Sequence, residues 1–175
     1  KPQIMGVINI TPDSFSDGGQ LYAGNRLNQS KTLVAIEKML NDGADIIDLG
    51  GESTRPGAAE VSEQQELERI LPILELVLDR FDVLVSVDTS TAIVIREASV
   101  KGAHLINDVR ALTRDGALEA AAQSRLPVCL MHMQNQPQTM QIKPGYQDVA
   151  AEVLAFLMSR KQDCLDAGIA AEQII

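Results

Sequence analysis

Short apolar runs alternate with longer amphipathic stretches along the whole chain. The runs are rich in isoleucine and valine and stop at polar residues, which is typical of buried parallel strands. The stretches between them place apolar residues three and four positions apart, which is typical of helices that cover a sheet. The pattern predicts strands at Ile4–Ile10, Asp45–Leu49, Val83–Val87, His104–Ile106 and Val128–Met131.

Local signals mark several helix ends. Gly43 follows an amphipathic stretch where a left-handed cap is expected, and Ser62 with Gln65 has the form of a capping box. Ile174-Ile175 looks like the opening of a sixth strand. The predicted helices are Leu27–Leu40, a stripe from Ser62 to Leu78, Thr91–Lys101, Gly116–Ser124 and Tyr146–Ala167.

The order of elements predicts an α/β fold, a (β/α)8 TIM barrel truncated after about five units, within one domain over residues 1–175. A weak repeat, Gly43–Asp48 against Gly102–Asn107, supports such units. Units of roughly 34 residues would need about 270 residues for eight. A doubly wound open sheet is the alternative, but no Gly-x-Gly-x-x-Gly follows the first strand.

The amino-acid composition limits which classes of binding partner the protein can have. Hydrophobic residues make up 45% of the 175, enough for a sizeable core, and the net charge is −9. This charge argues against nucleic acid or an anionic membrane as a partner, so an anionic substrate would need local cations. Cys129 and Cys164 look like core residues in a reducing compartment, and no apolar run approaches membrane-spanning length. We therefore predict a cytoplasmic protein.

Polar residues stand where the predicted strands end: Asn9, Asp48, Asp88, Asn107 and His132. In a barrel these ends converge on one pocket. Any one of them could instead cap the following helix. Neighbouring aspartate and asparagine suit a ring with amide and amino groups better than zinc, and Asn9 could give one oxygen to a magnesium ion that bridges phosphates.

The loop after the second strand is dense in functional groups. It carries Glu52, Ser53, Thr54, Arg55 and Pro56 among glycines. A guanidinium recognises phosphate or carboxylate through paired hydrogen bonds, so the loop is a candidate anion-binding segment. A plain polar turn is the alternative.

The first loop and the histidines are weaker candidates. Phe15 lies between Asp13 and Asp17 beside two glycines, which suggests a mobile lid. His104 begins a strand and is predicted to be structural, whereas His132 is at the pocket end and is a candidate lining residue.

Five ordered motifs resemble the dihydropteroate synthase family of pterin-binding enzymes. They are MGVINITPDSFSDGG at Met5–Gly19, DIIDLGGESTRPGAAEV at Asp45–Val61, VSVDTS at Val85–Ser90, LINDVRAL at Leu105–Leu112 and PVCLMHMQ at Pro127–Gln134. Pterin-binding methyltransferases share the barrel and the polar strand ends. They are not expected to carry both TPDSFSDGG and STRPGA, so they rank second.

The resemblance implies condensation of 6-hydroxymethyl-7,8-dihydropterin pyrophosphate with 4-aminobenzoate, giving dihydropteroate and pyrophosphate. It implies that Asp88 and Asn107 grip the pterin ring. Thr54 and Arg55 would belong to a loop that closes over the other substrates. Asn9 would meet the pyrophosphate and bind its Mg²⁺, the one cofactor expected.

Further roles also come from the resemblance alone. Asp17 would join Asp88 in stabilising positive charge on the pterin methylene, and Phe15 and Pro56 would wall the aminobenzoate pocket. The family implies a homodimer at full length and inhibition by sulfonamides. Its further aspartate, its lysine and its arginine–histidine pair cannot be assigned here. The 175-residue chain alone is therefore expected to be an inactive barrel fragment.

Overall fold

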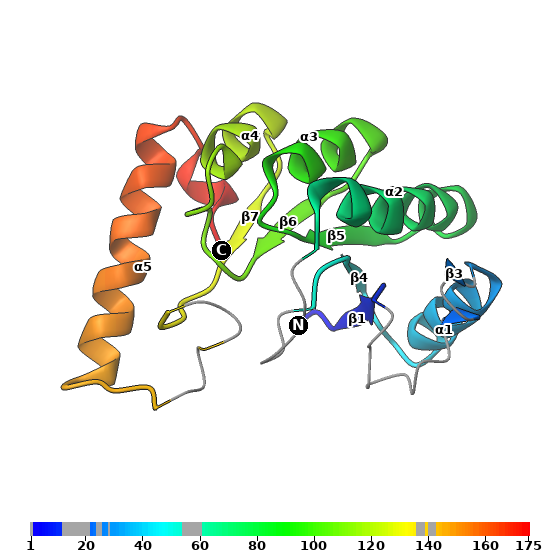
Figure 1. The fold of residues 1–175 in the computed structure, drawn as a ribbon, viewed down its shortest axis with the longest axis horizontal. Coiled ribbons are helices and arrows are strands. Elements are labelled where there is room, and N and C mark those ends of the chain that lie inside the picture. The colour runs from blue at the N-terminus through cyan, green and yellow to red at the C-terminus, as the bar shows by residue number, and fades with distance from the viewer. Residues whose placement is uncertain are drawn as a thin grey trace.

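Five parallel strands form the central sheet of the computed structural model (Figure 1), which describes residues 2–11, 22–23, 26–27, 29–53, 61–135, 139 and 143–175. The spatial order is β1 (Met5–Asn9), β4 (Ile46–Gly50), β5 (Leu84–Asp88), β6 (Leu105–Asp108) and β7 (Val128–Leu130). This order follows the sequence, as in the wall of a barrel. The predicted α/β class is confirmed.

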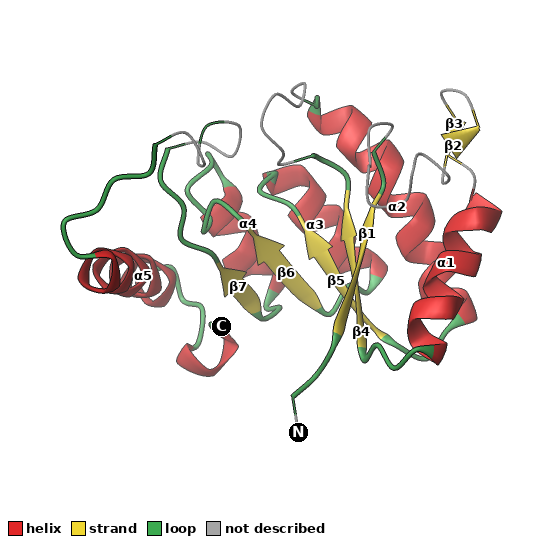
Figure 2. Cartoon of the chain, turned by 90° about the horizontal axis from the view of Figure 1, so that it is seen from below, coloured by secondary structure: helices red, strands yellow, loops and turns green. Residues whose placement is uncertain are grey.

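Helices connect the strands along one face of the sheet (Figure 2). They are α1 (Gln29–Asn41), α2 (Glu63–Arg80), α3 (Ala92–Lys101) and α4 (Ala117–Ser124). Helix α5 (Val149–Asp166) lies beyond β7, and the 3-10 turn η1 (Ala171–Gln173) follows it. In the described parts of the chain, no helix is both long and apolar enough to cross a membrane.

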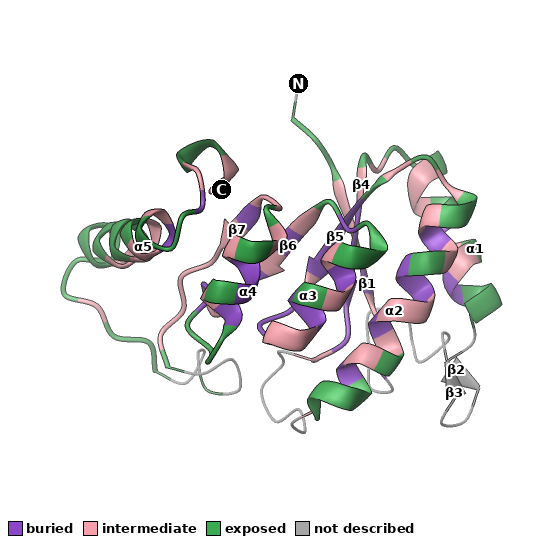
Figure 3. Cartoon of the chain, turned by 90° about the horizontal axis from the view of Figure 1, so that it is seen from above, coloured by how far each residue is buried: buried purple, intermediate pink, exposed green. Residues whose placement is uncertain are grey.

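The strands bury alternate residues under the helices. Ile8, Leu49, Val87 and Ile106 are fully buried on the helix side. Val7 and Leu84 point to the other face and are 48% and 44% exposed. Buried positions on α1 to α4 likewise face the sheet, whereas α5 buries only Cys164 (Figure 3). The sheet therefore has one covered face and one open face, which we call the inner face.

The end of the chain begins to cover the β7 edge. Ile174 forms a parallel bridge with Val128, and the Ile175 N–H donates to the Val128 carbonyl at 2.8 Å. The predicted opening of a sixth strand is confirmed.

Element boundaries differ modestly from the predictions. Helix α1 begins at Gln29 rather than Leu27, because Leu27 pairs with Tyr22 in a hairpin of β2 (Tyr22–Ala23) and β3 (Arg26–Leu27). Helix α5 begins at Val149 rather than Tyr146, because the Asp148 side chain accepts a hydrogen bond from the Ala151 N–H at 3.0 Å. The capping box of Ser62 and Gln65 is confirmed.

Candidate active site

One row of residues crosses all five strands near their carboxyl ends. Asn9 is in register with Gly50, Gly50 with Asp88, Asp88 with Asn107, and Asn107 with Cys129. Residues in register on parallel strands point to the same face. The polar side chains of this row therefore share the inner face, as the sequence predicts for Asn9, Asp88 and Asn107.

Gly50 allows two of these side chains to converge. A Cβ atom at Gly50 would lie 3.4 Å from Asn9 Oδ1 and 3.6 Å from Asp88 Oδ2. The missing side chain leaves that space to the amide and the carboxylate on either side. The sequence predicts that Asn9 and Asp88 lie at strand ends, and the structure brings both side chains close to the open space above Gly50.

Asp48 is a correction to the prediction. The strand continues to Gly50, so Asp48 lies within β4 rather than at its end. Gly50 keeps pairing because it is in register with strand residues on both sides. Asp48 is 2% exposed, and its Oδ2 atom accepts a hydrogen bond from Asn107 Nδ2 at 3.3 Å. It belongs to the inner face one layer below the row.

The Asp88 carboxyl is held in an environment that disfavours its charge. Burial, followed by repulsion from nearby carboxylates, raises the pKa of Asp88 to about 8. The contributing carboxylates are Asp48, Asp108, Glu66 and Glu52. A ligand that offers N–H donors or positive charge would favour the ionised form, so this carboxyl suits recognition of an electron-poor, hydrogen-bond-donating ring.

A buried hydrogen-bond network around Asp108 connects the segments that follow β5 and β6. Asp108 accepts hydrogen bonds from the Ser90 hydroxyl and, at 2.8 Å, from the N–H groups of Arg110 and Leu112. Arg110 in turn donates to Ser90 Oγ at 3.0 Å. These contacts fix the turns that follow β5 and β6, directly after the strand ends that carry Asp88 and Asn107.

Arg110 also reaches back to the segment after β4. Its guanidinium donates to both carboxylate oxygens of Glu52, at 2.9 and 3.1 Å. The pair is nearly buried, with side chains 11% and 10% exposed. Sequence reasoning gave neither residue a role in this pairing, because the partners are far apart along the chain. Their fixed geometry anchors Glu52 close to the loop that carries Thr54 and Arg55.

Removing one member of this pair is expected to destabilise the fold strongly. Arg110→Met leaves the Glu52 carboxylate buried without its partner, and we expect the free energy of unfolding to fall by about 3 kcal/mol. The measurement is urea denaturation of the parent and the variant. Lys38→Met is the control, because Lys38 and Asp42 form an exposed ion pair whose loss should cost less than about 0.5 kcal/mol. Equal effects of the two substitutions would contradict this prediction.

A second carboxylate supports the turn after β5. Glu66 of α2 is 1% exposed and accepts hydrogen bonds from the hydroxyls of Thr89 at 2.5 Å and Thr91 at 2.6 Å. Burial raises the pKa of Glu66, while these hydroxyls oppose the rise. Gly51 lets the chain pass close to this helix, since a Cβ there would lie 3.1 Å from Glu66 Cγ. The helix side of the sheet thus holds the Asp88 turn in place.

The histidines have structural surroundings. His104 Nδ1 accepts a hydrogen bond from the Val85 N–H at 3.1 Å, which confirms its predicted structural role. His132 packs its ring against Tyr146 and Phe156, with centroids 5.9 and 5.1 Å away. It therefore contacts the α5 region. Cys164 is buried as predicted, while Cys129 is half-buried in the inner-face row.

Five predicted site residues lie outside the described residues: Phe15, Asp17, Thr54, Arg55 and Pro56. The described residues show where their segments leave the sheet. The Ile10 N–H donates to the Gly50 carbonyl at 2.7 Å, so the chain leaves β1 and β4 side by side. Both segments therefore start next to Asn9 and Asp88.

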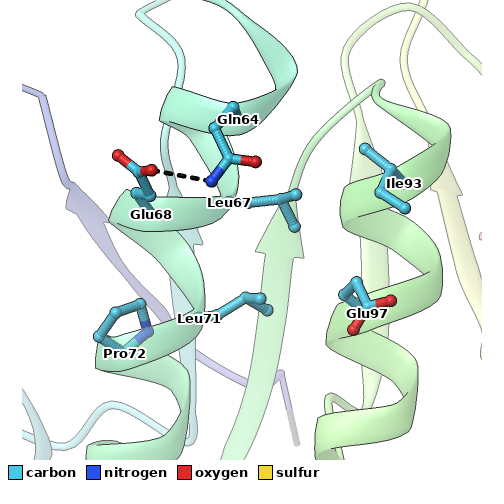
Figure 4. A pocket seen from close by; sticks show the side chains of 7 residues that line it. All are labelled: Gln64, Leu67, Glu68, Leu71, Pro72, Ile93 and Glu97. Carbon is cyan, nitrogen blue, oxygen red and sulfur yellow. Dashed lines mark hydrogen bonds between the residues drawn. The ribbon is translucent and has the colours of Figure 1, made fainter.

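A separate groove lies on the helix side, between α2 and α3 (Figure 4). It has a volume of about 340 Å³ and an apolar lining that includes Leu67, Leu71 and Ile93. Its rim carries Glu97 and a Gln64–Glu68 hydrogen bond of 2.8 Å. Because the sheet separates it from the inner face, this groove takes no part in the candidate active site.

Together, the parallel sheet, its outer helices and the polar strand ends define an α/β barrel protein of the class that binds small molecules at the strand carboxyl ends. The family model for pterin binding enzymes matches residues 5–175. The chain belongs to the pterin binding enzyme family, and its relatives named below are dihydropteroate synthases.

Individual relatives agree with this assignment. The dihydropteroate synthase of Haemophilus influenzae is 56% identical over 174 residues, which are 99% of this chain and 62% of that protein. The Yersinia pestis dihydropteroate synthase, solved with a sulfonamide drug complex, has a TM-score of 0.93 at 53% identity, over 99% of this chain and 62% of that one. The Burkholderia cenocepacia enzyme complexed with 7,8-dihydropteroate has a TM-score of 0.83 at 39% identity, over 99% and 57%. The chain spans about three fifths of the length of these relatives.

Proposed function

We propose that this chain supplies part of a dihydropteroate synthase active site. The reaction joins 6-hydroxymethyl-7,8-dihydropterin pyrophosphate to 4-aminobenzoate and releases pyrophosphate. The observation that carries the proposal is the row of Asn9, Asp88 and Asn107 on the inner face, in which Asn9 and Asp88 approach each other above Gly50 and Asn107 is in register with Asp88. The motifs and the relatives' names agree with it.

Asp88 and Asn107 take the pterin ring in this proposal. A carboxylate accepts from ring N–H and amino groups, and an amide both donates and accepts, so the pair matches a ring that carries both kinds of group. As the bond from the pterin methylene to the pyrophosphate oxygen breaks, its electron pair leaves with pyrophosphate. The positive charge left on the methylene is stabilised by Asp88 and, from the first loop, by Asp17.

The amine of 4-aminobenzoate then forms the new C–N bond and loses a proton. Phe15 and Pro56 wall its pocket, and Thr54 and Arg55 bind the anionic groups. These four assignments, like that of Asp17, rest on the motifs in residues 12–21 and 54–60. The Ile10–Gly50 hydrogen bond supports them, because both segments begin beside the row.

Magnesium fits this site as an ion shared with the substrate. Within the described ranges, no group of three or more histidine, cysteine or acidic side chains is placed to hold a metal. Mg²⁺ is often bound through one or two protein oxygens together with substrate phosphates and water. Asn9 Oδ1 is such an oxygen at the pyrophosphate end. The ion would neutralise charge on the departing pyrophosphate.

The test measures dihydropteroate formation and pyrophosphate release, with and without 4-aminobenzoate, in a protein of the relatives' full length. We expect product only when both substrates are present. Methyl transfer from a methylated folate, with no dihydropteroate, would favour the methyltransferase alternative instead. A homodimer at full length and a cytoplasmic location remain predictions.

Turnover is expected to depend on the planar guanidinium group of Arg55 and not only on its charge. Arg55→Lys keeps the charge but removes paired hydrogen bonding, so 4-aminobenzoate-dependent turnover should fall roughly tenfold. Steady-state kinetics of the full-length protein measure this. Arg96→Lys, on the exposed side of α3, is the control and should leave turnover unchanged. Unchanged turnover in Arg55→Lys would mean that the loop is only structural.

A further inference from the structure

Asp48 is a buried carboxylate to which the proposed reaction gives no role. It lies on the inner face, in register with Val7 of β1 and Ser86 of β5, and is 2% exposed. A buried carboxylate normally has a cation or several good donors around it. Asp48 forms no ion pair among the described residues.

Among the described residues, Asp48 makes its hydrogen bond of good geometry with Asn107. Asn107 Nδ2 donates to Asp48 Oδ2 at 3.3 Å, although β5 lies between their two strands. The contact crosses the inner face of β5, where the small Ser86 side chain is in register with Asp48. A bulky residue at position 86 would obstruct this crossing.

The rest of the Asp48 carboxylate is poorly satisfied. Asp48 Oδ1 and Ser86 Oγ are buried and make no hydrogen bond of good geometry, and no other buried side-chain N or O atom of the described residues shares this condition. Burial raises the pKa of Asp48, and the nearby Ser86 hydroxyl and the long Asn107 hydrogen bond only partly oppose the rise, so they do not offset the desolvation of the carboxylate. Stability therefore does not explain why an acid occupies this position.

The contact does fix the orientation of the Asn107 amide. An asparagine offers one oxygen acceptor and two N–H donors. With one N–H directed at Asp48, the oxygen must lie on the other side of the amide. The reversed orientation would bring the Asn107 oxygen against a carboxylate oxygen, which is repulsive.

We propose that Asp48 is a positioning residue, which holds the Asn107 amide so that its oxygen and its second N–H form an acceptor–donor pair for the pterin ring beside Asp88. The inference rests on the proposed function, because only there does Asn107 bind the pterin. It adds a residue that acts through Asn107 without touching substrate.

The first test is pterin binding in the full-length protein. Asp48→Leu removes the acceptor at similar volume, and we expect the Kd for 6-hydroxymethyl-7,8-dihydropterin pyrophosphate to rise about tenfold by calorimetry. The KM for 4-aminobenzoate should change less than about twofold. Asp48→Asn should restore binding to within about threefold, because an amide oxygen can still accept from Asn107. Ser86→Ala is the matched control and should bind like the parent.

A double-mutant cycle separates positioning from general damage. In an Asn107→Ala background, Asp48→Leu should weaken pterin binding no further, since the amide that it orients is gone. Equal weakening in both backgrounds would overturn the inference, as would an unchanged Kd in Asp48→Leu. If circular dichroism shows that Asp48→Leu is unfolded, Asp48→Ala is judged by the same criteria.

A ligand-free measurement keeps this inference distinct from the proposed reaction. The side-chain amide signals of Asn107, identified by their loss in Asn107→Ala, should shift in Asp48→Leu and not in Ser86→Ala. A parent protein that makes no dihydropteroate would refute the proposed function alone. If the Asn107 amide signals do not shift in Asp48→Leu, the positioning role is refuted, whether or not the parent protein makes dihydropteroate.

Discussion

Asp88→Asn is expected to lower the enzymatic activity of the full-length protein and to raise the stability of the 175-residue chain. In the full-length protein it should lower dihydropteroate formation by about 30-fold or more, because a hydrogen bond to a charged group contributes roughly 2 kcal/mol. Steady-state turnover measures this, with Asp82→Asn, an exposed aspartate before β5, as the control. Near-normal turnover in Asp88→Asn would remove this residue from the pterin site.

The same substitution should stabilise the 175-residue chain at pH 8. The pKa of Asp88 is about 8 in the folded chain and 3.8 as its ordinary value, so the folded state keeps the proton up to a higher pH than the unfolded state does. The stability that this proton provides is complete below about pH 4 and is lost as the pH rises to about 8. Asp88→Asn cannot ionise, so its advantage in urea denaturation should be near zero at pH 4 and on the order of 5 kcal/mol at pH 8, from about four pKa units at about 1.4 kcal/mol each. A constant difference across this range would show that burial of the charge is not the cause.

The 175-residue chain alone is expected to give no detectable turnover. Its sheet ends at β1 on one side, and residues 174–175 only begin to cover the other. Val7 and Leu84 are exposed on the inner face, which a closed barrel would fill with side chains. The resemblance also implies a lysine and an arginine–histidine pair that cannot be assigned here. Each missing donor would account for roughly 10²- to 10³-fold in rate.

The measurement adds a second polypeptide. The purified chain is assayed for dihydropteroate, then mixed with a separately produced segment that carries the remaining strands of a full-length relative. Activity that appears only on mixing would show that the two parts share one site. Turnover by the chain alone would contradict the prediction and show that the inner face described here is sufficient.

Strands and their order were accessible from the sequence because their signals are local. The run Val83–Val87 is continuous and β-branched, and the observed strand, Leu84–Asp88, matches it within one residue. The β2–β3 hairpin cannot be predicted from the sequence, because strands of two residues leave no periodic signal. The sequence predicts a strand end at Asp48 because two glycines follow the apolar run, whereas Gly50 continues the pairing on both sides.

Only part of the candidate site can be predicted from the sequence. Asn9, Asp88 and Asn107 each follow an apolar run, so their common edge could be predicted from the barrel rule. The Glu52–Arg110 pair could not, because charge pairing across distant segments depends on how two turns meet in space. The Asp48–Asn107 contact could not either, since it needs the register of three strands at once.

The alternation along the strands has a consequence for how the family can change under selection. Ile8 and Asn9, Val87 and Asp88 are sequence neighbours, yet one of each pair packs under the helices and the other faces the pocket. Changes in ligand affinity can therefore arise at pocket positions without disturbing the hydrophobic packing of the neighbouring residue. Substitutions at the inner-face row are then expected to need few compensating substitutions in the core.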